Sequence, residues 1–221
     1  MNPNPSIARR HPQNSNLWLH HEPRYRGLEV MVHAKGPMIG NYLETLYRVL
    51  HASWAEYPRT WAVRIDLRFP KHADYDPAEA CITRFIESLK AKVRHDRQRA
   101  ASQNRYSHDS QVRYVWAREF GQEGKPHYHV LLLFNRDAYF TLGSYTSLQE
   151  NMYQRINKAW ANALYISYDA ALGLAHMPSH PWYRIPDEAN LASVFYRASY
   201  LCKAYSKQYM VEGRSFGASQ V

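Results

Sequence analysis

Two histidines, His127 and His129, stand one residue apart at the start of a strongly apolar run, residues 130–134. Alternate side chains of a β-strand project from the same face, so the two imidazoles would lie on one side, roughly 7 Å apart along the backbone. Two neutral imidazoles at this spacing can bind one divalent metal ion. The apolar run predicts a rigid buried strand, which would hold the two rings in place better than a loop.

An acidic residue precedes the histidine pair at a distance that suits a hairpin. Glu119 stands eight residues before His127, and the turn-forming stretch 121–125 lies between them. Folding the chain back at this turn would bring the Glu119 carboxylate to the face of the two imidazoles. Two histidines and one carboxylate leave coordination positions open, as a catalytic metal requires. The alternative is a pair of ordinary histidines at a strand end, but the acid on the paired strand favours a metal site.

A second group of candidate residues lies near the C-terminal end. Two tyrosines and two lysines follow helical spacing there, at i, i+4, i+7 and i+11: Tyr196, Tyr200, Lys203 and Lys207. On a helix they would form one continuous stripe. Alone, this pattern is typical of a face that packs through its side-chain stems. Beside a metal site, a tyrosine hydroxyl can instead act as a nucleophile on a phosphodiester, and a nearby lysine can stabilise the developing charge.

Other titratable residues are weaker candidates. Asp66 lies on the polar face of a predicted strand, where an ion pair with Arg64 or Arg68 would also explain it. Four further histidines fall in predicted loops or irregular segments: His20, His21, His176 and His180. We expect these four to make surface or nucleic-acid contacts at most.

The elements that must position these residues follow from hydrophobic periodicity. Alternation with a period of two predicts strands, and apolar residues three or four apart predict helices. Strands are expected at 28–35, 60–69, 111–120 and 127–134, with two short strands within 173–185. Helices are expected at 41–53, 76–100, 147–164 and 187–207. Asp76 with Pro77 would open the second of these helices, and Asp187 would open the last.

The order of elements predicts an α+β fold. The segment 60–69 alternates apolar and charged residues, so we expect one buried and one exposed face. The strands at 111–120 and 127–134 are joined by a tight turn and must be antiparallel. We therefore expect a central, mainly antiparallel sheet flanked by helices.

The chain divides into one domain with two irregular ends. Residues 1–27 are polar, basic and rich in proline, and are expected to form an irregular arm. Residues 28–210 are expected to form a single domain, and residues 211–221 a frayed tail.

Composition narrows the class of partner. The 221 residues carry 28 Lys and Arg against 19 Asp and Glu, a net charge of +9, together with 18 tyrosines and six tryptophans. Basic groups interleaved with aromatic rings suit single-stranded nucleic acid. The two cysteines form no CxxC pair, and no run reaches the length of a membrane span. We expect a protein of a reducing cytoplasm that does not contact a membrane.

Three segments together resemble the HUH endonucleases, a superfamily named after its His–hydrophobic–His motif. PHYHVLLLF resembles that motif, YLCK resembles its Tyr-x-x-Lys motif on a downstream helix, and WAVRIDLRFP stands where the superfamily has a hydrophobic first strand. The order is that of replication initiators, some of which place a third metal ligand at the spacing of Glu119. More narrowly, RIDLRFP, EFGQEGKPHYHVLLLFN and YRASYLCKAYSK are similar to the inovirus Gp2 family, which includes prophage proteins of the YagK/YfjJ type, over about residues 37–207.

The resemblance implies a sequence-specific DNA endonuclease and strand transferase that initiates rolling-circle replication of a phage, prophage or plasmid-like element. Mg²⁺ or Mn²⁺ would bind His127, His129 and Glu119 and polarise the scissile phosphate of single-stranded or hairpin origin DNA. Tyr200 would attack phosphorus, leaving a 5′-phosphotyrosine link and a free 3′-hydroxyl, and Lys203 would assist by its charge.

Two further points follow from the family's pattern. Tyr196 lies one helical turn before Tyr200, and some initiators use two tyrosines at that spacing; Ser199 stands where Tyr196 would need its lysine. The chain has no GxxxxGK[ST] motif, so unwinding would come from a host helicase and synthesis from a host DNA polymerase.

Three other functions compete with this interpretation. A single-tyrosine transposase or relaxase would use the same chemistry for another purpose. A DNA-binding regulator could keep the scaffold without catalysis. A two-histidine, one-carboxylate iron oxygenase fits worse, because its usual ligand order places an acid where His129 stands.

Overall fold

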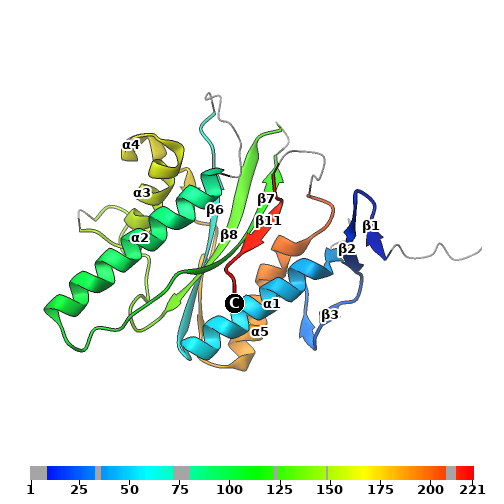
Figure 1. Cartoon of the computed structure of the whole chain (residues 1–221), viewed down its shortest axis with the longest axis horizontal. Helices are drawn as coiled ribbons and strands as arrows, with labels where there is room; N and C mark the ends of the chain where they lie inside the picture. Colours follow the sequence, from blue (N-terminus) through cyan, green and yellow to red (C-terminus); the bar gives the residue numbers. More distant parts are fainter. Residues whose placement is uncertain (1–8, 33–35, 72–79, 122–123, 148, 208–212) are drawn as a thin grey trace, which may run out of the picture.

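The computed structural model describes residues 9–32, 36–71, 80–121, 124–147, 149–207 and 213–221 (Figure 1). The strands are β1 (Arg10–His11), β2 (Asn14–His20), β3 (Arg24–Tyr25), β4 (Leu28–Glu29), β5 (Met38–Ile39), β6 (Thr60–Arg68), β7 (Arg113–Phe120), β8 (Pro126–Asn135), β9 (Ala175–His176), β10 (Trp182–Ile185) and β11 (Phe216–Ala218). The helices are α1 (Gly40–Glu56), α2 (Ala80–Gln103), α3 (Met152–Leu164), α4 (Tyr168–Ala171), α5 (Glu188–Ala198) and the 3₁₀ helix η1 (Ser199–Cys202).

Six of the described strands form one sheet at the centre of the fold. Its order is β10-β6-β8-β7-β11, and β9 also pairs with β6. Each of these pairings is antiparallel. The expected α+β fold with a central antiparallel sheet is confirmed, and the two short strands expected within 173–185 correspond to β9 and β10.

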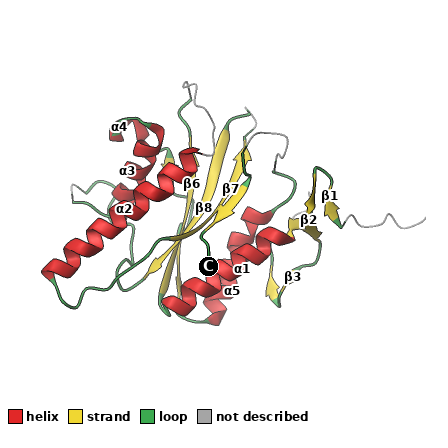
Figure 2. Ribbon diagram, in the orientation of Figure 1, coloured by secondary structure: helices red, strands yellow, loops and turns green. Residues whose placement is uncertain are grey.

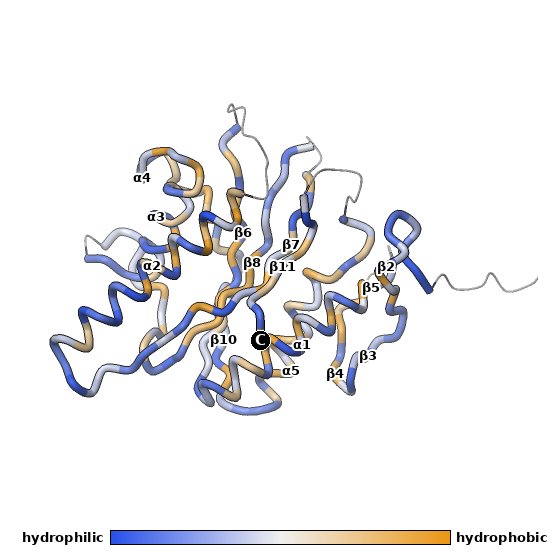
Figure 3. The backbone as a smooth tube through the Cα atoms, in the orientation of Figure 1, coloured by the Kyte–Doolittle hydropathy of each residue, from blue (hydrophilic) through white to orange (hydrophobic). Residues whose placement is uncertain are grey.

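The apolar strand β8 lies in the middle of this sheet. It pairs with β6 from Thr60↔Asn135 to Arg68↔His127. On its other edge it pairs with β7 from Arg113↔Leu133 to Phe120↔Pro126. A strand that is paired on both edges and packed on both faces has its backbone groups satisfied and little freedom to move. Figure 3 shows the hydrophobic stretches concentrated along these central strands.

Helices cover both faces of the sheet (Figures 1 and 2). The helices α2 and α3 pack on one face, where Trp61, Phe85 and Trp160 belong to one buried cluster. The helices α1 and α5 pack on the other face, where Leu46 and Phe195 belong to a second cluster. Sequence alternation predicted that one face of β6 would be exposed, and this prediction is wrong. Its second face is covered by α1 and α5 along most of its length: Ala62 and Asp66 are buried, Arg64 is half-buried, and the terminal Arg68 is exposed.

The region before α1 is folded, in contrast to the irregular arm expected at residues 1–27. Within the described residues 9–32, β1 and β2 form a three-stranded sheet with β5, and β3 and β4 form a small hairpin. Leu17 packs against Ile39 and Ala204. A side chain on Gly40 would overlap the ring of Trp18. Because β2 finds its partner β5 almost 20 residues later, local polarity did not reveal it.

The C-terminal segment also joins the fold. Residues 216–218 form β11, which pairs with β7 at the edge of the central sheet, so the expected frayed tail at 211–221 is wrong for this part. Gly217 lies directly opposite Trp116. A Cβ atom at Gly217 would lie 2.6 Å from the Trp116 ring, so only a glycine allows this close approach.

The helices match the predicted segments, with shifted ends. The capping role expected for Asp187 is confirmed, since its side chain accepts a hydrogen bond from the Asn190 N–H. The helix expected at 147–164 begins only at Met152, after Asn151 as cap. Asp76 and Pro77, expected to open α2, lie outside the described residues. No helix in the described ranges is both long and apolar enough to span a membrane.

The last helix is shorter than predicted. The helix α5 ends at Ala198, the 3₁₀ turn η1 follows, and Lys203 is already extended, with φ −60° and ψ 136°. Ser199 Oγ donates to the Tyr196 carbonyl at 2.7 Å and accepts from the Met31 N–H at 2.8 Å. Lys203 then forms a β-bridge with Met38. These contacts with the segment before α1 compete with helical continuation, so the stripe expected over 196–207 does not form.

Candidate metal centre

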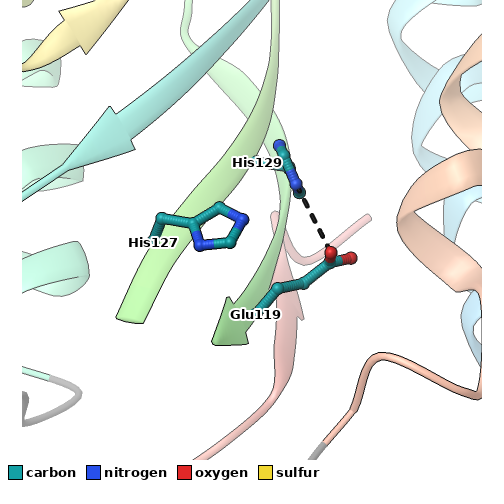
Figure 4. A group of neighbouring side chains, drawn as sticks. All are labelled: Glu119, His127 and His129. Carbon is teal, nitrogen blue, oxygen red and sulfur yellow. Dashed lines mark ion pairs between the residues drawn. The ribbon is translucent and has the colours of Figure 1, made fainter. Parts of the chain in front are cut away.

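The β7–β8 hairpin brings the predicted metal ligands together. Glu119 lies directly opposite His127, and His129 lies opposite Ala117 two residues further along β8. Directly paired residues share a face of the sheet, so all three ligand side chains project towards the α1 and α5 side. Figure 4 shows the two imidazoles and the carboxylate converging at the end of the hairpin.

The three side chains are close enough to bind one ion. One ligand atom from each of Glu119, His127 and His129 lies within 4.8 Å of the others. The His129 Nε2 atom is 3.5 Å from Glu119 Oε2, and the two imidazole centroids are 4.9 Å apart. Ligand atoms around a small divalent ion are roughly 3 to 3.5 Å apart, so small side-chain rotations would complete the site. The donor set therefore fits a divalent metal.

Asp66 holds His129 from the neighbouring strand β6. The two residues are directly paired, and His129 Nδ1 lies 2.5 Å from Asp66 Oδ1. With Nδ1 bonded to Asp66, the ring turns its Nε2 atom towards Glu119, on the side where a metal ion would bind. Asp66 was the weaker candidate for the site, and the alternative of a surface ion pair does not describe it, because Asp66 is buried and Arg64 lies further away, at 3.8 Å.

Two lysines converge on the carboxylate of Glu119. Lys203 Nζ lies 2.9 Å from Oε2, and Lys207 Nζ lies 3.0 Å from Oε1. Their side chains are only 3% and 0% exposed. Burial alone would raise the pKa of the Glu119 carboxyl, but the hydrogen bond with His129 and the charges of the lysines hold this pKa well below its usual range. The carboxylate is therefore ionised, and the two buried ammonium groups balance its charge.

The histidines differ in their electrostatic environment. Burial, reinforced by the neighbouring His129, lowers the pKa of His127, so its imidazole is neutral at pH 7. Burial would lower the pKa of His129 too, but its hydrogen bonds to Asp66 and Glu119 raise it. A metal ion at Nε2 would take the place of that second proton.

The predicted nucleophile lies at this centre, but the second tyrosine does not share its position. The Tyr200 ring packs edge-on against His129, with centroids 5.7 Å apart and an interplanar angle of 81°. Lys203 Nζ lies 3.5 Å from the centroid of the same ring. Tyr196 is on α5, before the helix ends, and is 38% exposed. The break after Ala198 separates the two tyrosines, which a continuous helix would have aligned.

One residue at the site was missed by sequence reasoning. His176, expected to have no special role, lies on β9 directly opposite Asp66, and its Nδ1 atom is 3.9 Å from Asp66 Oδ2. Asp66 thus has a histidine on each side. The short strand β9 carries no periodicity that would have indicated this pairing. His20, by contrast, contacts the Arg24 carbonyl in the N-terminal hairpin region.

Comparison with known proteins identifies relatives over nearly the whole chain. The family model of the YagK/YfjJ C-terminal domain matches residues 20–219. YagK of Escherichia coli (strain K12) is 34% identical over 199 residues, which cover 84% of this chain and 95% of YagK. YfjJ of the same organism is 30% identical over 200 residues, covering 84% of this chain and 96% of YfjJ. Neither name states an activity. No solved structure matches the chain.

Proposed function

Because the chain belongs to the family of the YagK/YfjJ C-terminal domain, whose name specifies no reaction, we propose a function from its metal centre: metal-dependent nicking and joining of single-stranded DNA through a covalent tyrosine intermediate. In this proposal the nick is made at the origin of a phage, prophage or plasmid-like element and starts rolling-circle replication. The motifs that resemble HUH endonucleases support the choice of reaction.

The observation that carries the proposal is the position of Tyr200 beside His129. Its ring lies against the imidazole, 5.7 Å between centroids, although the two residues are 71 positions apart in the chain. Packing alone does not require a tyrosine at this position of the sheet. Here it stands next to two imidazoles and a carboxylate that can bind one ion. A nucleophile beside a site for a phosphate-binding cation is the arrangement that phosphodiester transfer requires.

The residues of the chain account for the steps of the reaction. When bound, Mg²⁺ or Mn²⁺ would polarise a non-bridging oxygen of the scissile phosphate. The Tyr200 hydroxyl gives its proton to solvent water and its oxygen forms a bond to phosphorus, while the bond from phosphorus to the 3′-oxygen breaks and that oxygen takes a proton from solvent water. The products are a 5′-phosphotyrosine and a free 3′-hydroxyl. The ammonium of Lys203, 3.5 Å from the Tyr200 ring, offsets negative charge that develops in this step.

The proposal is tested by capture of the covalent intermediate. The probe is a library of single-stranded oligonucleotides with a randomised centre and a label at the 3′ end, incubated with the protein and Mn²⁺. Because the bond forms to the 5′ phosphate of the downstream fragment, the protein should acquire the 3′ label in an SDS-resistant adduct. A 5′ label should not be transferred. Sequencing of the adduct then gives the nicking site.

Substitutions assign the nucleophile. We expect Tyr200→Phe to form no adduct and Tyr196→Phe to form it at a rate close to wild type. His127→Ala and His129→Ala should lose the adduct together with Mn²⁺ binding. Adducts that persist in Tyr200→Phe would reject Tyr200 as the nucleophile. Absence of any adduct in the wild-type protein would reject the nicking reaction.

One observation favours a second candidate, a DNA-binding regulator that keeps the scaffold without catalysis. Both oxygens of Glu119 are already paired with buried ammonium groups, so the cluster is neutralised by the chain itself. In a regulator this network would serve stability alone. Wild-type protein would then bind DNA equally well with and without Mn²⁺ and form no adduct. A transposase or relaxase would form the adduct but would differ in the sequence that it nicks.

A further inference from the structure

A cleft of about 620 Å³ lies between the second half of α2 and the loop that follows it. Lys90, Arg94, Arg97 and Gln98 line its helical wall, and residues 107–112 form the opposite wall. The volume is in the range of ligand-binding sites in proteins. None of the residues of the metal centre lines this cleft.

The helical wall belongs to a strongly basic segment. Between residues 90 and 105 six residues are basic: Lys90, Lys92, Arg94, Arg97, Arg99 and Arg105. The same segment has one acidic residue, Asp96, which is buried and paired with Arg97 and Arg155. Asp96 therefore neutralises Arg97 but not the other cations that line the cleft. One acid, Asp109, also lines the cleft, so the lysine and arginine side chains of the lining outnumber its acidic side chains by three to one. A concave surface with an excess of positive charge concentrates anionic ligands.

The cations of the cleft are not equally engaged. Arg97 donates to Asp96 Oδ2 at 2.6 Å and to the His108 carbonyl at 3.3 Å, so it ties the two walls together. Lys90 pairs with Glu87. Arg94 is exposed and, across the described ranges of the chain, forms no hydrogen bond or ion pair. Its guanidinium keeps five N–H donors for a ligand, in the planar geometry that binds phosphate oxygens in pairs.

An exposed aromatic ring follows the basic helix. Tyr106 immediately precedes the cleft-lining loop and is 70% exposed. The Arg105 guanidinium lies over one side of its ring, 4.6 Å from the centroid. An exposed ring beside arginines is the combination that stacks a base while cations contact the phosphates.

We propose that this cleft binds the phosphate backbone of a nucleic-acid strand, and that Tyr106 stacks on one of its bases. The cleft is separate from the metal centre: Val112 precedes β7 and Glu119 is near its other end, roughly 24 Å away along the strand. The helix α2 also packs on the face of the sheet opposite α1 and α5 (Figure 1). The choice of nucleic acid as ligand rests on the proposed function, whereas the cleft and its charge do not.

The first test compares two charge reversals on the same helix. Arg94→Glu alters the cleft, and Lys92→Glu makes the same charge change outside the lining residues. Binding of a fluorescein-labelled single-stranded oligonucleotide is measured by anisotropy at several salt concentrations. The measurement uses the Tyr200→Phe background without metal, so that failure of the nicking reaction cannot affect it. We expect Arg94→Glu to weaken the affinity for the oligonucleotide about tenfold and to reduce the slope of log affinity against log salt concentration by about one. Lys92→Glu should weaken the affinity about twofold.

The second test concerns the stacking ring and the source of the phosphates. Tyr106→Ala should weaken binding of the single strand more than of its duplex, whereas Tyr165→Ala, an equally exposed ring under Arg84, should change neither. Equal losses for Arg94→Glu and Lys92→Glu would reject the cleft in favour of diffuse charge. Equal effects of the two tyrosine substitutions would reject stacking.

Displacement of the oligonucleotide by ATP at matched phosphate concentration would identify a free nucleotide as ligand and reject the strand. Melting temperatures equal to wild type verify that each variant is folded.

Discussion

Asp66 and His129 lie directly opposite each other on β6 and β8, with the imidazole Nδ1 2.5 Å from the carboxylate. The contact fixes the ring with Nε2 towards Glu119, so Asp66 orients a candidate metal ligand without belonging to the three residues that could bind the ion. Such outer partners raise the basicity of the imidazole and limit its rotation. Because Asp66 lies in a strand that is paired on both edges, the sheet itself fixes the position of its carboxylate relative to His129.

We therefore expect Asp66→Asn to bind Mn²⁺ about 10 to 100 times more weakly than the wild type. An asparagine keeps the shape of the side chain but loses the charge that stabilises the Nδ1 proton. Isothermal titration calorimetry measures the change directly. Asp169→Asn, at an exposed position on α4, is the matched control and should bind Mn²⁺ normally. Equal affinities in the two variants would show that Asp66 does not orient the ligand.

Some residues of the site are predictable from the sequence because they lie close together along the chain. Glu119, His127 and His129 belong to one hairpin, and a short turn together with period-two alternation defines their register. Asp66 and His176 reach the site through pairings of β6 with distant strands. Such pairings depend on which strands become neighbours, which no local pattern encodes. For this reason the sequence alone does not indicate His176 and indicates Asp66 only weakly.

The lysines show a different kind of error. Lys203 and Lys207 were expected on a helical stripe with Tyr196 and Tyr200, yet they reach Glu119 from a chain that has left the helix. Helical propensity favoured continuation through this region. The contacts of Ser199 with Met31, and the bridge between Met38 and Lys203, override it. The sequence places both lysines on one stripe with Tyr200, whereas in the structure it is tertiary contacts that bring them to Glu119.

Asp96 should make the stability of the protein depend on acidic pH. Its carboxylate accepts hydrogen bonds from Tyr139 at 2.7 Å and from Arg155 at 2.5 Å. Burial alone would raise the pKa of Asp96, but these contacts and Arg97 lower it below the ordinary value. A lowered pKa in the folded state contributes stability above the unfolded pKa, about 3.9, and this contribution is lost as pH falls through the folded value.

Asp96→Asn is expected to reduce the free energy of unfolding by about 3 kcal/mol at neutral pH, because the buried Arg155 loses its close partner and keeps only Glu150, 3.9 Å away. Urea unfolding followed by circular dichroism measures this value. The difference from wild type should stay constant down to about pH 4 and shrink below it. Asp137→Asn, which breaks a partly exposed pair with Arg59, should cost less than about 1 kcal/mol. A difference in the free energy of unfolding that grows below pH 4 would contradict the lowered pKa of Asp96.

The packing of β11 on the sheet depends on Gly217. A Cβ atom there would lie 2.6 Å from the Trp116 ring, which is itself buried. We expect Gly217→Ala to lower stability by about 1 to 3 kcal/mol and to increase hydrogen exchange of residues 216–218. Gly121→Ala, whose added carbon meets no atom closer than 3.8 Å, is the control. Unchanged exchange in Gly217→Ala would mean that β11 does not depend on this close contact.

Lys203 occupies the side of Glu119 on which a metal ion would bind. Its Nζ atom lies 2.9 Å from Oε2, the oxygen that faces His129 Nε2 at 3.5 Å. An ammonium group and a divalent ion would therefore share one carboxylate oxygen and repel each other across a buried site. The charge that assists Tyr200 in the proposed reaction should thus weaken metal binding.

Lys203→Met should separate these two effects. We expect it to bind Mn²⁺ about ten times more tightly than the wild type, since a positive charge beside the ion is removed, while adduct formation falls. Calorimetry gives the affinity, and the 3′-label transfer assay gives the adduct rate. Lys203→Arg keeps the charge and should resemble the wild type in metal affinity. Weaker Mn²⁺ binding by Lys203→Met would instead show that the lysine holds Glu119 in position for the metal, as a structural partner rather than a competitor.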